Sequence, residues 1–442
     1  MNLPIPLPLI VGPIVAALVT QGLRFRQRLA AIVGAVLAWV LAWWVTATST
    51  TDAASALSAG VFGQSFMAFL WTALGGVFLL TLLLPQSAAF VPGGLLLMVP
   101  VSAALMTPDG LLRPPLLLLA MGVLAMLMQT RQPNTQAAMM LFSVAVPGTV
   151  LLLLAEVGLQ EGQTAVLPNG RWFLLAACML FLGGFPGHFW IQWLAEKVSG
   201  PVMLLAFAWM PLVVMFLLHE QILQIPALWQ DSQFTTLLQW SGVAAALLSA
   251  LVIFFAPTFS RLVAGLLLLD MGITLPVLSL PGMVGWQTAV SLHLNRFLSL
   301  LIMTIAWHWL KASGLTTSIA GSRDVGRQAP FGTFLFIFGC FSLVGLPLTP
   351  GFSGRWALMA SLSQIGQVPW WVLVLLLTAM VGAALGILRH LAVLVQPMPD
   401  KVQSTVETRW IQGAAVLLLI IGIIFAAFPQ LTMTYAARIV GL

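Results

Sequence analysis

The sequence predicts an all-α, polytopic membrane protein with about 14 transmembrane helices. Of its 442 residues, 60% are hydrophobic and only 6% are charged, and the mean hydropathy is +1.05. Soluble domains carry about a quarter of their residues as charged side chains. The apolar runs are continuous and about 20 residues long, the length of a spanning helix, whereas barrel strands alternate polar and apolar residues.

Hydropathy locates the individual spans along the chain. The first begins at MNLPIPLPLIVGPIVAALV, which has no basic segment and no small-residue cleavage site, and we interpret it as a retained helix rather than a signal peptide. The expected spans are 5–22, 29–47, 62–84, 90–106, 114–130, 136–155, 171–192, 199–219, 234–255, 259–279, 285–310, 330–362 (broken), 369–391 and 408–428.

The distribution of charge predicts the orientation, because lysine and arginine favour cytoplasmic loops. With 14 spans and both termini on the non-cytoplasmic side, the cytoplasmic face receives Arg24, Arg26, Arg28, Arg131, Lys197, Arg261, Lys311, Arg323, Arg327, Arg389, Lys401 and Arg409. The opposite face receives Arg113, Arg171 and Arg438, with Asp52, Asp109, Glu156, Glu161, Glu220 and Asp231. The net charge of +6 therefore reflects loops, and we expect no nucleic-acid partner.

The sequence contains no recognisable enzyme site. The two cysteines, Cys178 and Cys340, lie inside apolar spans, where they resemble small buried hydrophobic residues. There is no glycine-rich phosphate loop, no cluster of metal ligands and no nucleophile beside a base. We expect neither catalytic residues, nor a cofactor, nor a metal on this chain.

One segment, GLPLTPGFSGRW at residues 345–356, interrupts an otherwise apolar span. Proline removes a backbone donor and glycine tolerates unusual dihedral angles, so a break is expected over 346–352. Broken backbone at membrane depth is tolerated only where protein buries it or water fills the gap. The residues that predict the break are Gly345, Pro347, Pro350, Gly351 and Gly354. A simple kink, with Arg355 reaching for a lipid headgroup, is the alternative.

Three charged residues remain at membrane depth: Asp270, Arg296 and Arg355. Asp270 follows Arg261 by nine residues, which places it ~13 Å into the bilayer along a helix. Because an isolated charge there costs several kcal/mol, each needs a partner or a wet cavity. Such groups serve an ion pathway or form a structural ion pair, and both interpretations stay open.

Two histidines are further candidates for an ion pathway. His293 precedes Arg296 by three residues and shares its helix face. Histidine titrates near neutral pH and can pass protons, whereas arginine effectively cannot deprotonate. His188 follows Pro186 at the end of a span, where it either lines a path or bonds backbone. Apart from His188, the spans between 114 and 218 contain no ionisable side chain.

These motifs resemble a known family. GLPLTPGFSGRW is similar to the broken twelfth helix of the antiporter-like subunits of complex I and Mrp cation antiporters, G-(I/L)-P-P-x-x-G-F-x-G-K. SRLVAGLLLLDMGI at 260–273 resembles their K-R-L-L-A-Y-S-S-I-x-H-M-G segment, and the PGHFW motif at 186–190 resembles P-F-H-x-W. The resemblance covers roughly 170–390 and implies two inverted five-helix repeats, each with a broken helix, crossed by a chain of charged residues that conducts protons.

The same resemblance implies a division of the chain: 1–110 N-terminal helices, 111–220 a first repeat, 221–365 a second repeat broken at 345–355, and 366–442 C-terminal helices. The sequence departs from the family at most functional positions. The first-repeat lysines fall on Phe181 and near Leu212, and 114–130 contains no glutamate. In the second repeat a lysine falls near Leu300, the histidine of H-M-G becomes Asp270, and the last lysine becomes Arg355.

The resemblance implies a membrane-arm subunit of a complex I-like assembly, at most a non-catalytic ion-translocating subunit of an NAD(P)H- or ferredoxin-quinone oxidoreductase or related complex. Translocation of protons or cations would use mainly the second half, through Asp270, His293, Arg296, Arg355 and His188. The alternatives are a structural subunit that does not conduct and an independent secondary transporter. Expected partners are other membrane subunits and the lipid of a bacterial-type inner or equivalent energy-coupling membrane.

Overall fold

A computed structural model describes residues 7–47, 60–107, 110–129, 135–160, 170–198, 200–225, 227–280, 282–312, 318–323, 325–364, 369–397 and 407–440. The chain forms two compact units. The first comprises Met1–Phe181, Lys197–Phe234 and Ala437–Leu442, and the second comprises Leu182–Glu196 and Thr235–Ala436. Among the described residues every named element is a helix. Arg131 and Lys401, and with them Asp52, Asp109 and Glu161, lie outside these residues, so the predicted orientation stays a prediction.

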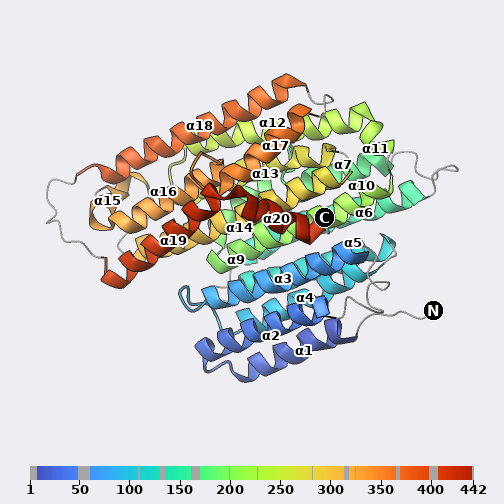
Figure 1. Ribbon diagram of the computed structural model, residues 1–442, viewed down its shortest axis with the longest axis horizontal. Coiled ribbons are helices and arrows are strands. Elements are labelled where there is room, and N and C mark those ends of the chain that lie inside the picture. Colours follow the sequence, from blue (N-terminus) through green and yellow to red (C-terminus); the bar gives the residue numbers. More distant parts are fainter. Residues whose placement is uncertain are drawn as a thin grey trace. The chain divides into compact units, whose positions relative to one another are not determined.

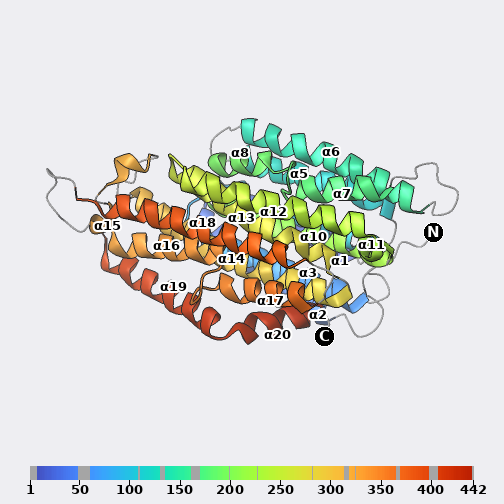
Figure 2. The same cartoon turned by 90° about the horizontal axis from the view of Figure 1, so that it is seen from above.

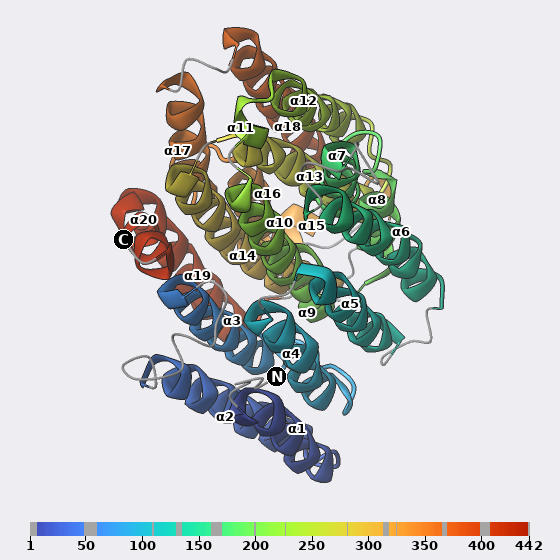
Figure 3. The same cartoon turned by 90° about the vertical axis from the view of Figure 1, so that its right-hand side faces the viewer.

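The first unit begins with four neighbouring helices, α1 to α4, which lie side by side in Figures 1 and 3. The helix α5 packs between α4 and α6, and α6 packs on α7. The bounds of this unit's helices are α1 Leu7–Gly22, α2 Gln27–Ala47, α3 Gly60–Leu80, α4 Phe90–Met106, η2 Gly110–Leu112, α5 Arg113–Gln129, α6 Thr135–Gln160, α7 Gly170–Phe181, α9 Gly200–Leu204, η3 Leu205–Trp209, α10 Met210–Gln224 and α11 Ala227–Gln230.

The second unit is centred on α14, which packs against α13, α16, α17 and α19, and Figure 2 shows α14, α16 and α17 close together. The helix α16 also touches α13 and α18. The bounds are α8 Phe189–Lys197, α12 Ser232–Phe254, α13 Phe259–Thr274, η4 Leu275–Ser279, α14 Gly282–Ala312, η5 Ala320–Ser322, α15 Val325–Gln328, α16 Pro330–Val344, α17 Gly351–Gln364, α18 Trp370–Val395, α19 Arg409–Ala427 and α20 Pro429–Val440.

The helices agree with the expected membrane spans. In the described part of the chain, 10 helices are long and apolar enough to cross a bilayer, and four shorter apolar helices cover Pro8–Gly22, Phe90–Met106, Gly170–Phe181 and Pro330–Val344. The predicted polytopic all-α class is therefore confirmed. The amphipathic sequence of α20 follows the last expected span, so hydropathy did not locate this helix.

The expectation of one continuous helix over 171–192 was wrong. The helix α7 ends at Phe181, and α8 starts only at Phe189. Gly183 in the gap has a φ of 67°, a left-handed conformation that glycine adopts without strain. The neighbouring helix α12 satisfies the exposed backbone, since Phe185 N–H donates to the Ser241 carbonyl at 3.1 Å and Ser241 Oγ donates to the Phe185 carbonyl at 2.8 Å. The order of three helices, one broken helix and one further helix occurs twice among the described helices, in α4–α10 and in α12–α18, whereas the resemblance implied repeats over 111–220 and 221–365.

Candidate functional site

The break between α16 and α17 begins where a glycine cap ends α16. Gly345 has a φ of 85°, and its N–H donates to the Ser342 carbonyl while Leu346 N–H donates to the Phe341 carbonyl. This pair of bonds is a Schellman cap, which satisfies carbonyls that the end of the helix would otherwise leave open. A Cβ at Gly345 would meet the Arg355 side chain. The glycine therefore both ends α16 and leaves room for the arginine.

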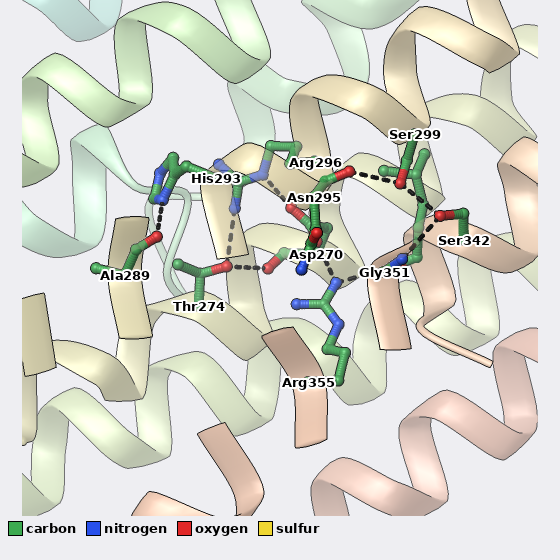
Figure 4. A network of polar contacts seen from close by, with 11 residues as sticks. Asp270, Thr274, Ala289, His293, Asn295, Arg296, Ser299, Ser342, Gly351 and Arg355 are labelled. Atoms are coloured by element: carbon green, nitrogen blue, oxygen red, sulfur yellow. Dashed lines mark hydrogen bonds and ion pairs between the residues drawn. The ribbon is translucent and has the colours of Figure 1, made fainter. Parts of the chain in front are cut away.

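On the other side of the break, a short chain of hydrogen bonds through two serine hydroxyl groups holds the start of α17. The Ser342 Oγ accepts a hydrogen bond from Gly351 N–H at the start of α17, at 3.0 Å. The same oxygen lies 2.6 Å from Ser299 Oγ, and Ser299 Oγ donates to the carbonyl of Asn295 on α14 at 2.7 Å. Figure 4 shows this chain from Asn295 to Gly351. It meets the requirement that interrupted backbone at membrane depth find partners inside the protein.

The three charged residues at membrane depth meet beside this break (Figure 4). Asp270 on α13, Arg296 on α14 and Arg355 on α17 are 3%, 2% and 3% exposed. Asp270 Oδ2 accepts from Arg296 Nε, and Asp270 Oδ1 accepts from Arg355 Nη2. Residues that are 26 and 85 positions apart in the chain are thereby joined. The alternative of Arg355 reaching a headgroup is excluded by this geometry.

Further bonds hold the two guanidinium groups in place. Arg296 Nη2 donates to Thr274 Oγ1 at 2.8 Å, and Thr274 Oγ1 donates to the carbonyl of Asp270 at 2.6 Å. Arg355 Nη2 also donates to the Leu343 carbonyl in the last turn of α16 at 2.8 Å. One carboxylate between two guanidinium groups leaves a net charge of +1. Charge at this depth is costly, so the cluster needs these bonds to be stable.

The two histidines form no hydrogen bond or ion pair with the described residues of this charge cluster. His293 is buried, and its Nδ1 lies 2.8 Å from the carbonyl of Ala289 on its own helix. Figure 4 shows the ring turned toward Ala289. His188 lies between α7 and α8, half-buried, and stacks on Phe185 with ring centroids 5.5 Å apart. The structure thus joins three of the five predicted pathway residues through direct contacts.

In the first repeat the positions of the family's lysines are apolar and buried. Phe181 is 3% exposed and Leu212 is 2% exposed. Sequence reasoning nevertheless missed buried polar groups here, because it assigned Glu156 and Arg113 to the non-cytoplasmic face and did not expect them to be buried. Both are buried, Glu156 in the last turns of α6 and Arg113 at the start of α5. The available sequence signal was position, since Glu156 directly follows the expected span 136–155 and Arg113 directly precedes the span 114–130.

Comparison with known proteins supports the same kinship. No protein-family model matches the chain. NADH-ubiquinone oxidoreductase chain 2 of Mammuthus primigenius is 25% identical over 266 residues, which cover 57% of this chain and 70% of that protein. A chain of the archaeal membrane-bound sulfane sulfur reductase superimposes with a TM-score of 0.81 at 17% identity, covering 98% of this chain and 97% of the other. A chain of the Mrp complex from Dietzia sp. DQ12-45-1b gives 0.79 at 13% identity, covering 98% and 96%.

The fold and the buried charges define a multi-pass helical membrane protein in which a discontinuous helix meets charged side chains inside a helical bundle. The chain is similar in sequence to chain 2 of NADH-ubiquinone oxidoreductase. It also shares its fold with chains of the membrane-bound sulfane sulfur reductase and of an Mrp complex. The resemblance first suggested by GLPLTPGFSGRW is confirmed.

Proposed function

We propose that this protein is a membrane-arm subunit of a complex I-like assembly and contributes to proton or cation translocation mainly through its second half. The observation that carries the proposal is the cluster of Asp270, Arg296 and Arg355 beside a capped helix break. Charged side chains at bilayer depth are rare and usually functional, because each costs several kcal/mol. The arginines set the electrostatic field and hold water, while Asp270 and His293 supply groups that can change charge.

The same similarity supports a proposal for the membrane context. Related chains occur in a respiratory reductase, an Mrp complex and NADH-ubiquinone oxidoreductase. We infer that other membrane subunits of such an assembly, together with lipid, are the partners of this chain. We place it in a bacterial-type inner membrane or an equivalent energy-coupling membrane, with both termini on the non-cytoplasmic side.

The translocation role is tested with the assembly reconstituted in vesicles that report internal pH. The variant D270N should abolish ion movement, whereas R261Q, at an exposed pair with Glu196, should leave it unchanged. Because D270N also leaves two buried guanidinium groups without an anionic partner, the charge-free variant D270L/R296M/R355M is measured beside it. Unchanged pumping by either cluster variant in correctly assembled complexes refutes the proposal.

A structural role is the second candidate, and one observation favours it. Both oxygens of Asp270 already accept hydrogen bonds from arginine, so the cluster ties α13, α14 and α17 together as a fixed lock. Under this alternative R355L disturbs assembly, and complexes with a normal subunit content after R355L argue against it. Purification separates both candidates from an independent transporter, which would elute alone.

A further inference from the structure

A second buried polar cluster joins α6 and α10, although the sequence indicated no ionisable side chain other than His188 in the spans between 114 and 218. Its centre is Glu156 on α6, which is 6% exposed, and its direct partner is Gln221 on α10, also 6% exposed. Gln221 Nε2 donates a hydrogen bond to Glu156 Oε1. The two residues are 65 positions apart, so tertiary packing alone creates the pair.

The charges around this pair leave Glu156 without a cation of its own. Arg113 Nη2 pairs with Glu220 Oε1 at 3.1 Å, and Arg113 Nε donates to the carbonyl of Thr107 at 3.0 Å. Arg171 pairs with Asp231. None of the ion pairs found in the described part of the chain includes Glu156. Among the described residues, ionised Glu156 and Glu220 with Arg113 would carry a net charge of −1.

The Gln221 amide points to a protonated Glu156, in which the negative charge of the carboxylate is neutralised. Its Oε1 is buried and has no hydrogen-bond partner, although a buried amide oxygen left open costs about 1–3 kcal/mol. A carboxylic acid and a primary amide can bond at two points, N–H to carbonyl and O–H to amide oxygen. A protonated Glu156 has an O–H that Gln221 Oε1 can accept, whereas an ionised Glu156 can accept hydrogen bonds and cannot donate one.

Packing around the carboxyl favours a proton over a metal cation. The backbone of Gly110 lies so close that a Cβ there would meet the Glu156 carboxyl group. A Na⁺ ion needs several oxygen ligands at the metal–oxygen distance. The backbone of Gly110 occupies the side of the Glu156 carboxyl group where such ligands would have to lie. A proton needs no additional room. Glu156 lies four residues before the end of α6, about 6 Å along the axis, which is close enough to the helix end for exchange with water.

We propose that Glu156 and Gln221 form a proton-binding site at the end of α6 in the first repeat. The site gives this half of the chain a titratable group in place of the missing lysines and glutamate. The charged and titratable side chains on the elements packed nearby are Arg113 on α5, Arg171 on α7, and His219 and Glu220 on α10. The inference does not depend on translocation through the second half.

The test is infrared difference spectroscopy of the full chain in its native complex, titrated from acid to alkaline pH. A protonated carboxyl gives a carbonyl stretch that shifts in D₂O. We expect the wild type to show such a band and E156Q to lose it. The matched control is E196Q, at the exposed pair with Arg261, and it should keep the band. Identical wild-type and E156Q spectra at every pH overturn the proposal.

Two further measurements fix the partner and the ligand. Removal of the amide in Q221L takes away the N–H bond to the carbonyl, so the band should move to higher wavenumber, and an unmoved band overturns the pairing. Addition of NaCl at constant pH should leave the band unchanged, and its loss would identify a metal cation instead of a proton.

If E156Q fails to fold, wild-type protein labelled with ¹³C-glutamate still assigns the band to a glutamate by its isotope shift. A band without that shift overturns the proposal. A chain that binds a proton here and does not translocate ions still shows the band, so failure of this inference is distinct from failure of the proposed function.

Discussion

Removal of the Asp270 charge should destabilise the protein far more than the loss of one ordinary ion pair. The carboxylate is 3% exposed and serves two guanidinium groups at once. A pair of unit charges at about 4 Å attracts by about 4 kcal/mol at an effective dielectric constant of 20. Loss of one partner of a buried pair costs about 3–5 kcal/mol, because the other charge stays buried without compensation.

The variant D270N leaves Arg296 and Arg355 facing each other with no anion between them. Their bonds to Thr274 Oγ1 and to the Leu343 carbonyl remain, so the groups are not wholly unpartnered. We therefore expect a loss of about 5 kcal/mol in the free energy of unfolding, the upper end of the range for a broken buried pair. The assay is reversible unfolding of the purified chain in mixed micelles, followed by far-UV circular dichroism.

Two controls make this prediction sharp. The variant R261Q removes a pair whose side chains are 53% and 31% exposed, and such pairs contribute about 0–1 kcal/mol. The charge-free variant D270L/R296M/R355M should recover most of the stability, because replacing a whole buried ionic cluster by apolar residues is often neutral or stabilising by about 1–4 kcal/mol. A loss below about 1 kcal/mol in D270N, equal to that of R261Q, would refute the reasoning.

Two further predictions concern the helix break and a helix start. The variant G345A should lower the free energy of unfolding by about 1–2 kcal/mol through the left-handed backbone conformation alone, and by more because the new methyl group displaces Arg355. The control variant G413A, whose new methyl group meets nothing within 4 Å, should gain stability. Equal unfolding midpoints for the two variants would contradict this prediction. Burial raises the pKa of Asp231, but hydrogen bonds from the N–H groups of Phe234 and Gln233, together with Arg171, outweigh it, and the pKa is lowered. The carboxylate therefore stabilises the start of α12 above the unfolded pKa of about 3.9, and this stabilisation is lost as pH falls through the lower folded pKa. The protection factor of the amides in the first turn of α12, that is, their exchange rate relative to the intrinsic rate at the same pH, should fall over that interval in wild type and stay constant with pH in D231N. An equal pH dependence of the protection factor in both would show that Asp231 is not the cause.

The sequence predicted the spans because hydropathy records a local property, the cost of placing each segment in hydrocarbon. It also predicted the break at Gly345–Pro350, since proline and glycine act through their own backbone chemistry. The resemblance implied a broken helix in each repeat, but hydropathy did not place the other break, which lies between Phe181 and Phe189. Its stability depends on Ser241 of α12, a partner that is remote in the chain.

The amino-acid sequence by itself determined that this chain is a polytopic helical membrane protein and which three charges lie at depth. Only the tertiary structure decided how those charges are partnered: Asp270 lies between Arg296 and Arg355, His293 turns back to Ala289, and Glu156 meets Gln221. The physical reason is that burial in hydrocarbon is a property of each segment, whereas a hydrogen bond or an ion pair needs two groups that separate helices bring together. A charged residue within an apolar segment predicts that the charge has a partner, and the packing of the helices determines which group that partner is.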